Sequence, residues 1–153
     1  MSNSGLKFER IVEELVGKIC PETIGVSGVI SKRRWETGES KGYQPDRELF
    51  LKSDPYMINR IIIGCKFQSV SGTAPEKIPH EITEITKAVY WNSALLHGIA
   101  LFGGPYYKKR SALLYVDECR RRFIGRKRKI QIMSVDIFAK MLKSGRIESI
   151  LTS

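Results

Sequence analysis

The stretch Ile61-Ile62-Ile63-Gly64-Cys65-Lys66-Phe67-Gln68 decides the fold, together with Pro45-Asp46 ahead of it in the chain. Its three consecutive isoleucines predict a strand that is buried on both faces. Because strand residues alternate between faces, Gly64, Lys66 and Gln68 lie on the same side. Buried charges are costly unless they are paired or functional. We therefore expect this polar face to lie beside Asp46.

Composition and charge narrow the class of protein. A chain of 153 residues is long enough for one domain, which we expect to span residues 1–153. Its 26 Lys and Arg against 16 Asp and Glu give a net charge of +10. This excess favours a polyanionic partner, most often nucleic acid, although a general solubility charge is the alternative.

The lack of a recognisable targeting signal and the cysteine usage predict an intracellular protein. No apolar run approaches the roughly 18 residues of a membrane span, and the N-terminus has no signal-peptide pattern. The three cysteines are far apart and lack the spacing of metal ligands. We expect reduced thiols, a cytoplasmic location and no membrane partner.

The order of the expected elements is helix, three strands, helix, strand, helix, strand, helix. We expect strands over 23–31, 48–52, 61–68, 97–102 and 129–135. We expect helices from about residue 6, over 79–88, over 108–123 with Gly125 as C-cap, and through 143 with Asp136 as N-cap. The opening strands form a meander, and strands separated by helices pair in parallel. The predicted fold class is therefore α/β, as an α+β mixed sheet with helices on both faces, and residues 36–44 form a mobile loop.

A carboxylate at a strand start beside a lysine and a glutamine suits phosphodiester hydrolysis. Carboxylates hold Mg²⁺ through hard oxygen ligands, and the metal polarises the scissile phosphate. A nearby lysine orients or deprotonates water. Glu9, at the flank of the first helix, is a second candidate acid, with a solvated helix-flank glutamate as the plain alternative. For Asp46 and Lys66, the plain alternative is an ordinary ion pair on a strand edge.

These residues resemble the PD-(D/E)XK nuclease superfamily, which includes many type II restriction endonucleases. Pro45-Asp46 followed by residues 64–68 resembles its motif, and the order α-β-β-β-α-β, here followed by α-β-α, resembles its restriction-endonuclease-like core. The similarity covers roughly residues 4–102. The resemblance implies that Asp46, Glu9 and the backbone carbonyl of Cys65 hold Mg²⁺ or Mn²⁺. It also implies that Lys66 positions the water, and that Gln68 orients water or phosphate.

Position 64 departs from the motif. The second acid of the motif, two residues before the lysine, falls on Gly64, which supplies no metal ligand. Three explanations stay open: an inactivating substitution, migration of the acid to another element with Glu9 compensating, or a degenerate subunit that only binds DNA. This chain is therefore expected to be inactive unless another acid takes that place.

Basic and aromatic residues elsewhere suit contacts with a DNA backbone. The candidates are Lys32, Arg33, Arg34, Lys41, Tyr106, Tyr107, Lys108, Lys109, Arg110, Arg121, Arg126, Lys127 and Arg128. With the resemblance, they lead to a Mg²⁺-dependent endonuclease that cuts double-stranded DNA, sequence-specifically as a restriction or homing type. Because two active sites are needed to cut both strands, we expect a homodimer or higher homo-oligomer. The alternatives are a structure-specific nuclease of the junction resolvase type and a catalytically silent DNA-binding subunit.

Overall fold

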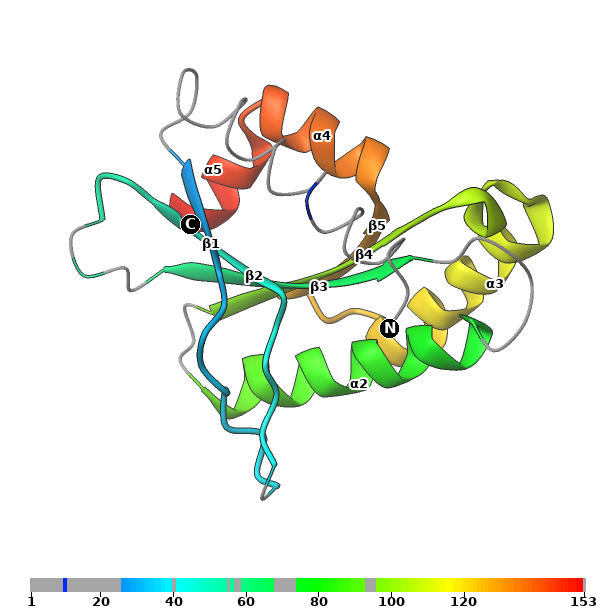
Figure 1. Ribbon diagram of the computed structural model, residues 1–153, viewed down its shortest axis with the longest axis horizontal. Coiled ribbons are helices and arrows are strands. Elements are labelled where there is room, and N and C mark those ends of the chain that lie inside the picture. Colours follow the sequence, from blue (N-terminus) through cyan, green and yellow to red (C-terminus); the bar gives the residue numbers. More distant parts are fainter. Residues whose placement is uncertain are drawn as a thin grey trace.

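A computed structural model describes residue 10 and residues 26–39, 41–54, 56, 59–67, 74–92 and 96–152. Within them a five-stranded sheet has helices on both faces (Figure 1). The strands are β1 (Val26–Ile30), β2 (Arg47–Leu51), β3 (Arg60–Phe67), β4 (Leu96–Gly103) and β5 (Ile130–Ser134). The helices are α2 (Ala74–Trp91), α3 (Arg110–Cys119), α4 (Val135–Lys143) and α5 (Arg146–Thr152), with a 3₁₀ turn η1 (Pro105–Lys108) and a π-helical turn η2 (Arg120–Ile124). Of the expected first helix, only Arg10 lies within the described residues.

The pairing of the strands confirms the predicted mixed sheet. β1 pairs with β2 and β2 with β3 in antiparallel fashion, whereas β3, β4 and β5 are parallel neighbours. The sheet order follows the chain order from β1 to β5. α2 connects β3 to β4, and α3 with η2 connects β4 to β5, as parallel neighbours require. The fold class expected from the sequence is thus confirmed.

Both faces of β3 are buried, as its run of isoleucines predicts. Ile61 and Ile63 pack on one side in a core shared with α4 and α5, and Cys65 belongs to the same core. Ile62 lies on the other side, in a core shared with α2 and α3. Within the described part of the chain, no helix is long and apolar enough to cross a membrane.

Helix α2 is longer than expected and contains Pro79. It begins at Ala74, although the sequence pattern placed its start at Pro79. A proline inside a helix removes one backbone hydrogen bond. The preceding residue, Ile78, is nevertheless buried in the α2-side core, so packing holds the first turns in place. Because the helix begins at Ala74, Glu81 lies in its middle and not in its first turn.

Other element boundaries also differ from expectation. The single helix expected over 108–123 is divided into η1, α3 and η2, and Gly125, with φ +56°, ends η2 as predicted. Ser134, not Asp136, caps α4 by accepting a hydrogen bond from the amide of Ile137 at 3.3 Å. α5 was not predicted. Of the loop expected over 36–44, the described residues 36–39 and 41–44 lie in an arm that is closed by a backbone pairing between Trp35 and Tyr43.

Close packing of α2 on the sheet generates a prediction about Gly98 on β4. A Cβ atom on Gly98 would lie 2.3 Å from Cγ2 of Ile85 and 3.1 Å from Cγ2 of Val89. We therefore expect Gly98→Ala to lower the free energy of unfolding by about 1–3 kcal/mol through overpacking. Chemical denaturation measures this change. Tyr56→Ala, at a side chain that is 79% exposed, is the control, and equal stability of the two variants would contradict the packing described.

Candidate active site

Asp46 lies where the pairing of β2 with β3 ends. Its amide donates a hydrogen bond to the carbonyl oxygen of Ile63 at 2.8 Å. Its side-chain Oδ2 accepts a hydrogen bond from the amide of Cys65 at 2.7 Å. Pro45, directly before it, has no N–H to continue the ladder. The carboxylate is therefore held beside residues 64 and 65, the neighbourhood that the sequence predicts.

Glu81 of α2 reaches the position where the motif lacks its acid. Glu81 is only 5% exposed and lies on the sheet-facing side of the helix. A Cβ atom on Gly64 would lie 1.8 Å from Oε1 of Glu81 and 2.6 Å from the hydroxyl oxygen of Tyr43. The carboxylate of Glu81 thus occupies the space of a side chain at position 64. A carboxylate therefore lies at this position of the strand, and it comes from the helix.

Both oxygens of the Glu81 carboxylate have partners. The Tyr43 hydroxyl donates a hydrogen bond to Oε1, and Nζ of Lys66 lies 3.3 Å from Oε2. The pKa of Tyr43 is raised well above its ordinary value, mainly because the side chain is buried. The negative charge of Glu81 and its hydrogen bond raise this pKa further, and the charge of Asp46 adds to the effect. Tyr43 therefore stays protonated and remains a donor at neutral pH. Lys66, one-third exposed, forms its ion pair with Glu81.

Tyr43 is placed by the arm that contains it. The backbone groups of Trp35 and Tyr43 exchange two hydrogen bonds, of 2.7 and 2.8 Å. At the tip of the arm, the ring of Trp91 from α2 packs against Gly38. The side chain of Asn92, directly after α2, donates a hydrogen bond to the carbonyl of Glu36 at 2.8 Å. The arm is therefore fixed along α2, which holds the Tyr43 hydroxyl at Glu81.

The remaining residues expected at the centre divide into two groups. Glu9 and Gln68 lie outside the described residues. Gly64 has the predicted place on the polar face, and Cys65 offers its backbone there while its side chain lies in the opposite core. Glu81 and Tyr43 were not expected at the site.

The oxygen atoms at this site suit a hard divalent cation. Within the described residues, no group of three or more His, Cys, Asp or Glu side chains could hold a metal ion. Asp46 and Glu81 instead bring two carboxylates to neighbouring residues of β3. Mg²⁺ usually keeps several waters and uses one or two carboxylates together with substrate phosphate oxygens. The donor set therefore fits such an ion.

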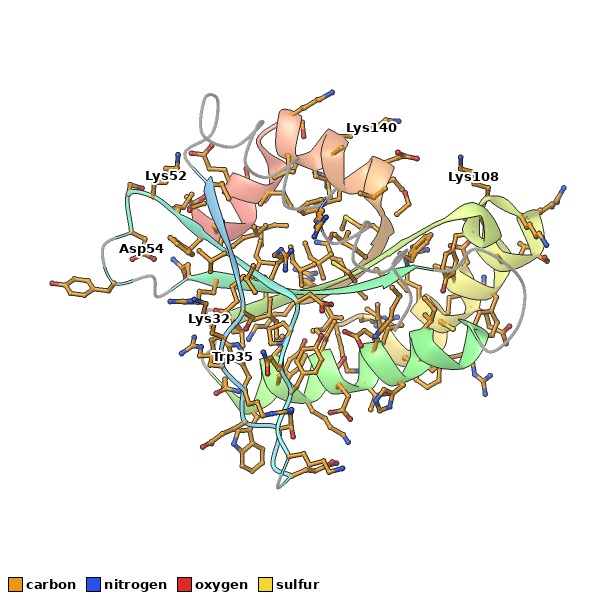
Figure 2. The ribbon with its side chains drawn as sticks, in the orientation of Figure 1. Lys32, Trp35, Lys52, Asp54, Lys108 and Lys140 are labelled. Atoms are coloured by element: carbon orange, nitrogen blue, oxygen red, sulfur yellow. The ribbon has the colours of Figure 1, made fainter. Side chains whose placement is uncertain are left out.

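The basic residues expected to contact DNA lie in three places. Lys32, Arg33, Arg34 and Lys41 are exposed on the arm and the segment leading into it. The segment 108–110 follows β4, whose last residues pair with Lys66 and Phe67, so it lies at the same end of the sheet as Lys66. Figure 2 shows Lys32 and Trp35 on the β1 side of the molecule and Lys108 on the α3 side.

The third group lies towards the other end of the sheet. Residues 126–128 precede Ile130, which pairs with Gly98 at the level of Ile62. That level is four residues, or about 13 Å, from Lys66 along the strand. Arg121 belongs to η2, on the same connection.

Tyr107 is buried and packs on Phe102 with ring centroids 4.9 Å apart, so it belongs to the core and not to the expected DNA-binding surface. The side chain of Tyr106 lies outside the described part.

A comparison with protein-family models identifies the class. Residues 42–145 match a PD-(D/E)XK nuclease superfamily domain. The match spans more than half of the chain, and this protein therefore belongs to the PD-(D/E)XK nuclease superfamily. The matched segment includes Tyr43, Asp46, Lys66 and Glu81. Nucleases of this superfamily generally use divalent metal ions. No curated protein and no solved structure matches the chain.

The contact between Gly64 and Glu81 generates a prediction of energetic coupling. We expect Gly64→Ala to destabilise the protein by about 1–3 kcal/mol, because the new Cβ displaces a buried carboxylate. Glu81→Ala removes that obstacle. The double variant should therefore be more stable than the sum of the two single effects by at least about 1 kcal/mol. Urea denaturation of the four proteins completes the cycle, and additive effects would show that residue 64 and Glu81 do not touch.

Proposed function

We propose that this protein is a Mg²⁺- or Mn²⁺-dependent endonuclease that hydrolyses phosphodiester bonds of double-stranded DNA at specific sequences. The observation that carries the proposal is the convergence of Asp46, Glu81 and Lys66 around Gly64. Superfamily membership supports nuclease chemistry. The location of Glu81 supports an active chain, because it supplies the acid that position 64 lacks.

Asp46, Glu81 and the backbone carbonyl of Cys65 would hold the metal. The two carboxylates and the Lys66 ammonium carry a net charge of −1, which favours a divalent cation and then a phosphate. Bound Mg²⁺ supplies polarisation of the scissile phosphate and a lower pKa for an attacking water. The Asp46 carboxylate is already oriented by the Cys65 amide. Because of that hydrogen bond, the Asp46 side chain would lose less conformational entropy when a metal binds.

Lys66 would act on water and phosphate. In the structure its ammonium group lies 3.3 Å from Glu81 Oε2. A cation held by Glu81 would compete with this ion pair and release Lys66 towards the substrate. The released ammonium group orients the attacking water and balances the charge of the phosphate. Tyr43 keeps its hydrogen bond to the other oxygen of Glu81, so the carboxylate does not have to rotate.

Nucleic acid would meet cations on two sides of the molecule. The arm and the segment leading into it supply Lys32, Arg34 and Lys41 on the β1 side, and the start of α3 supplies Arg110 on the other side. These cations agree in sign with the overall charge of +10. Because each subunit has one such centre, we further propose a homodimer or higher homo-oligomer for double-strand cleavage.

Plasmid cleavage tests the proposal. We expect the unaltered protein to cut supercoiled plasmid in Mg²⁺, and EDTA to stop the cleavage. Asp46→Asn and Glu81→Gln should each lower the rate more than about 100-fold, because losing a direct ligand costs more than losing its outer-shell partners. Gel electrophoresis over time measures the rates. Glu84→Gln is the matched control, since Glu84 is on the same helix but pairs with Lys87 at 3.7 Å.

The outcomes separate the alternatives. Equal activity of Glu81→Gln and Glu84→Gln would contradict the role of Glu81. No cleavage by the unaltered protein, with duplex affinity unchanged in Asp46→Asn, would favour a DNA-binding subunit. Discrete fragments indicate a sequence-specific enzyme, and cleavage of branched DNA alone indicates a junction resolvase.

A further inference from the structure

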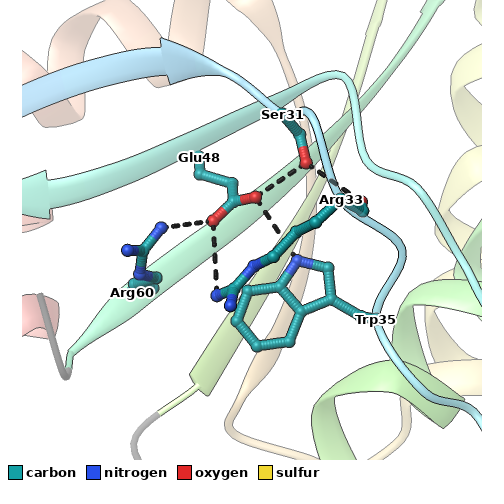
Figure 3. A network of polar contacts seen from close by, with 5 residues as sticks. All are labelled: Ser31, Arg33, Trp35, Glu48 and Arg60. Carbon is teal, nitrogen blue, oxygen red and sulfur yellow. Dashed lines mark hydrogen bonds and ion pairs between the residues drawn. The ribbon is translucent and has the colours of Figure 1, made fainter.

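A second buried carboxylate, Glu48 of β2, organises a network beside the active site (Figure 3). Glu48 is 2% exposed. Its Oε2 accepts hydrogen bonds from the Ser31 hydroxyl at 2.7 Å and from the Trp35 indole N–H at 3.4 Å. Its Oε1 lies 2.6 Å from Arg60 and 3.8 Å from Arg33. One acid therefore faces two guanidinium groups.

The two arginines contact Glu48 in different ways. Arg60 is mostly buried and its short contact neutralises the acid. The Arg33 side chain is 53% exposed and lies too far from Glu48 for a hydrogen bond. Its guanidinium carbon lies 3.7 Å from the centroid of the Trp35 ring. Arg33 thus lies over the indole ring, makes only a long ion pair with Glu48, and keeps more than half of its side chain exposed to solvent.

The surface around Arg33 is concave and positively charged. A shallow hollow is lined by Val29, Ile30, Lys32, Arg33, Glu48 and Arg60. Its three cations exceed its single acid by two charges. A planar guanidinium that is already oriented suits two parallel hydrogen bonds to an anionic oxygen pair. Phosphate and carboxylate groups both have this form, and the superfamily to which the chain belongs favours phosphate.

Ser31 connects this network to the catalytic centre. Its amide donates a hydrogen bond to the carbonyl oxygen of Asp46 at 3.2 Å, and its hydroxyl holds Glu48. Glu48 is also only two residues after Asp46, about 7 Å along an extended chain. An anion in the hollow would therefore lie within a few nucleotides of a phosphate at Asp46.

We infer that Arg33, with Lys32 and Arg60, binds a backbone phosphate of the DNA close to the one that is cleaved. Glu48 and Trp35 are its positioning residues, because they orient Arg33 without reaching the substrate. The inference rests on the proposed function for the nature of the ligand. Arg33 and Trp35 precede the residues 42–145 that match the family model. These two residues are therefore not covered by that match, whereas Glu48 and Arg60 are.

Binding of a labelled duplex in Ca²⁺, at several salt concentrations, tests the inference. Arg33→Ala should weaken binding about 10-fold and reduce the slope of log affinity against log salt by roughly 0.9, the value for one phosphate contact. Arg33→Lys keeps the charge and should retain most of the slope. Arg146→Ala, an exposed arginine on α5, is the control for loss of charge alone. Equal effects of Arg33→Ala and Arg146→Ala would overturn the inference.

A set of duplexes with one neutral methylphosphonate each locates the contact. For the unaltered protein, one or two positions near the cut should lower affinity about 10-fold. Those positions should have no effect on Arg33→Ala, because that contact is already lost. If every position weakens both proteins equally, Arg33 has no phosphate partner.

Variants of the positioning residues separate orientation from folding. Trp35→Phe keeps a ring for Arg33 and should bind more tightly than Trp35→Ala. Glu48→Gln should raise KM with little change in kcat, with its melting temperature measured alongside. If Trp35→Phe and Trp35→Ala bind equally, ring stacking does not position Arg33.

Cleavage assays on the same variants distinguish the two proposals. If Arg33→Ala cleaves DNA with the same KM as the unaltered protein, the phosphate contact is overturned and the nuclease function stands. Arg33-dependent duplex binding without any cutting supports the contact and overturns the catalytic proposal.

Discussion

The site depends on the close contact between the buried carboxylate of Glu81 and Gly64. An ionised carboxylate away from water needs partners, and removing one of them leaves an uncompensated charge. Here Tyr43 and Lys66 supply those partners from two different segments. A side chain on residue 64 would clash with this carboxylate, so Glu81 reaches the strand only because residue 64 is a glycine.

This contact constrains the surrounding fold. α2 has to lie close to β3 for a glutamate to reach position 64, and a second glycine, Gly98, allows the same close approach one strand further. The arm between β1 and β2 has to lie along α2 so that Tyr43 meets the same carboxylate. The sheet, the helix and the arm are thus fitted to one another around a single acid. Superfamily membership and the proposed metal chemistry then both fit an active chain.

Much of the fold could be predicted from local patterns. The isoleucines of β3, the meander and the parallel crossovers each follow from hydrophobic pattern and element order, and the proximity of Asp46 to Cys65 follows from strand pairing. Glu81 was missed because a helix starting at Pro79 places it in the first turn, where an acid is ordinary. In a helix that begins at Ala74, Glu81 lies on the same inner face as Ile78 and Ile85. An acidic residue on this apolar face was the feature of the sequence that could have indicated its role. Tyr43 could not be found, since its contact spans 38 residues.

The most direct measurement is a diffraction experiment on crystals soaked in Mn²⁺, which gives an anomalous signal at the metal position. We expect one ion held by Asp46, Glu81 and the carbonyl oxygen of Cys65, with Lys66 moved away from Glu81. An ion held without Glu81, or none at saturating Mn²⁺ while Lys66 still pairs with Glu81, would contradict this expectation.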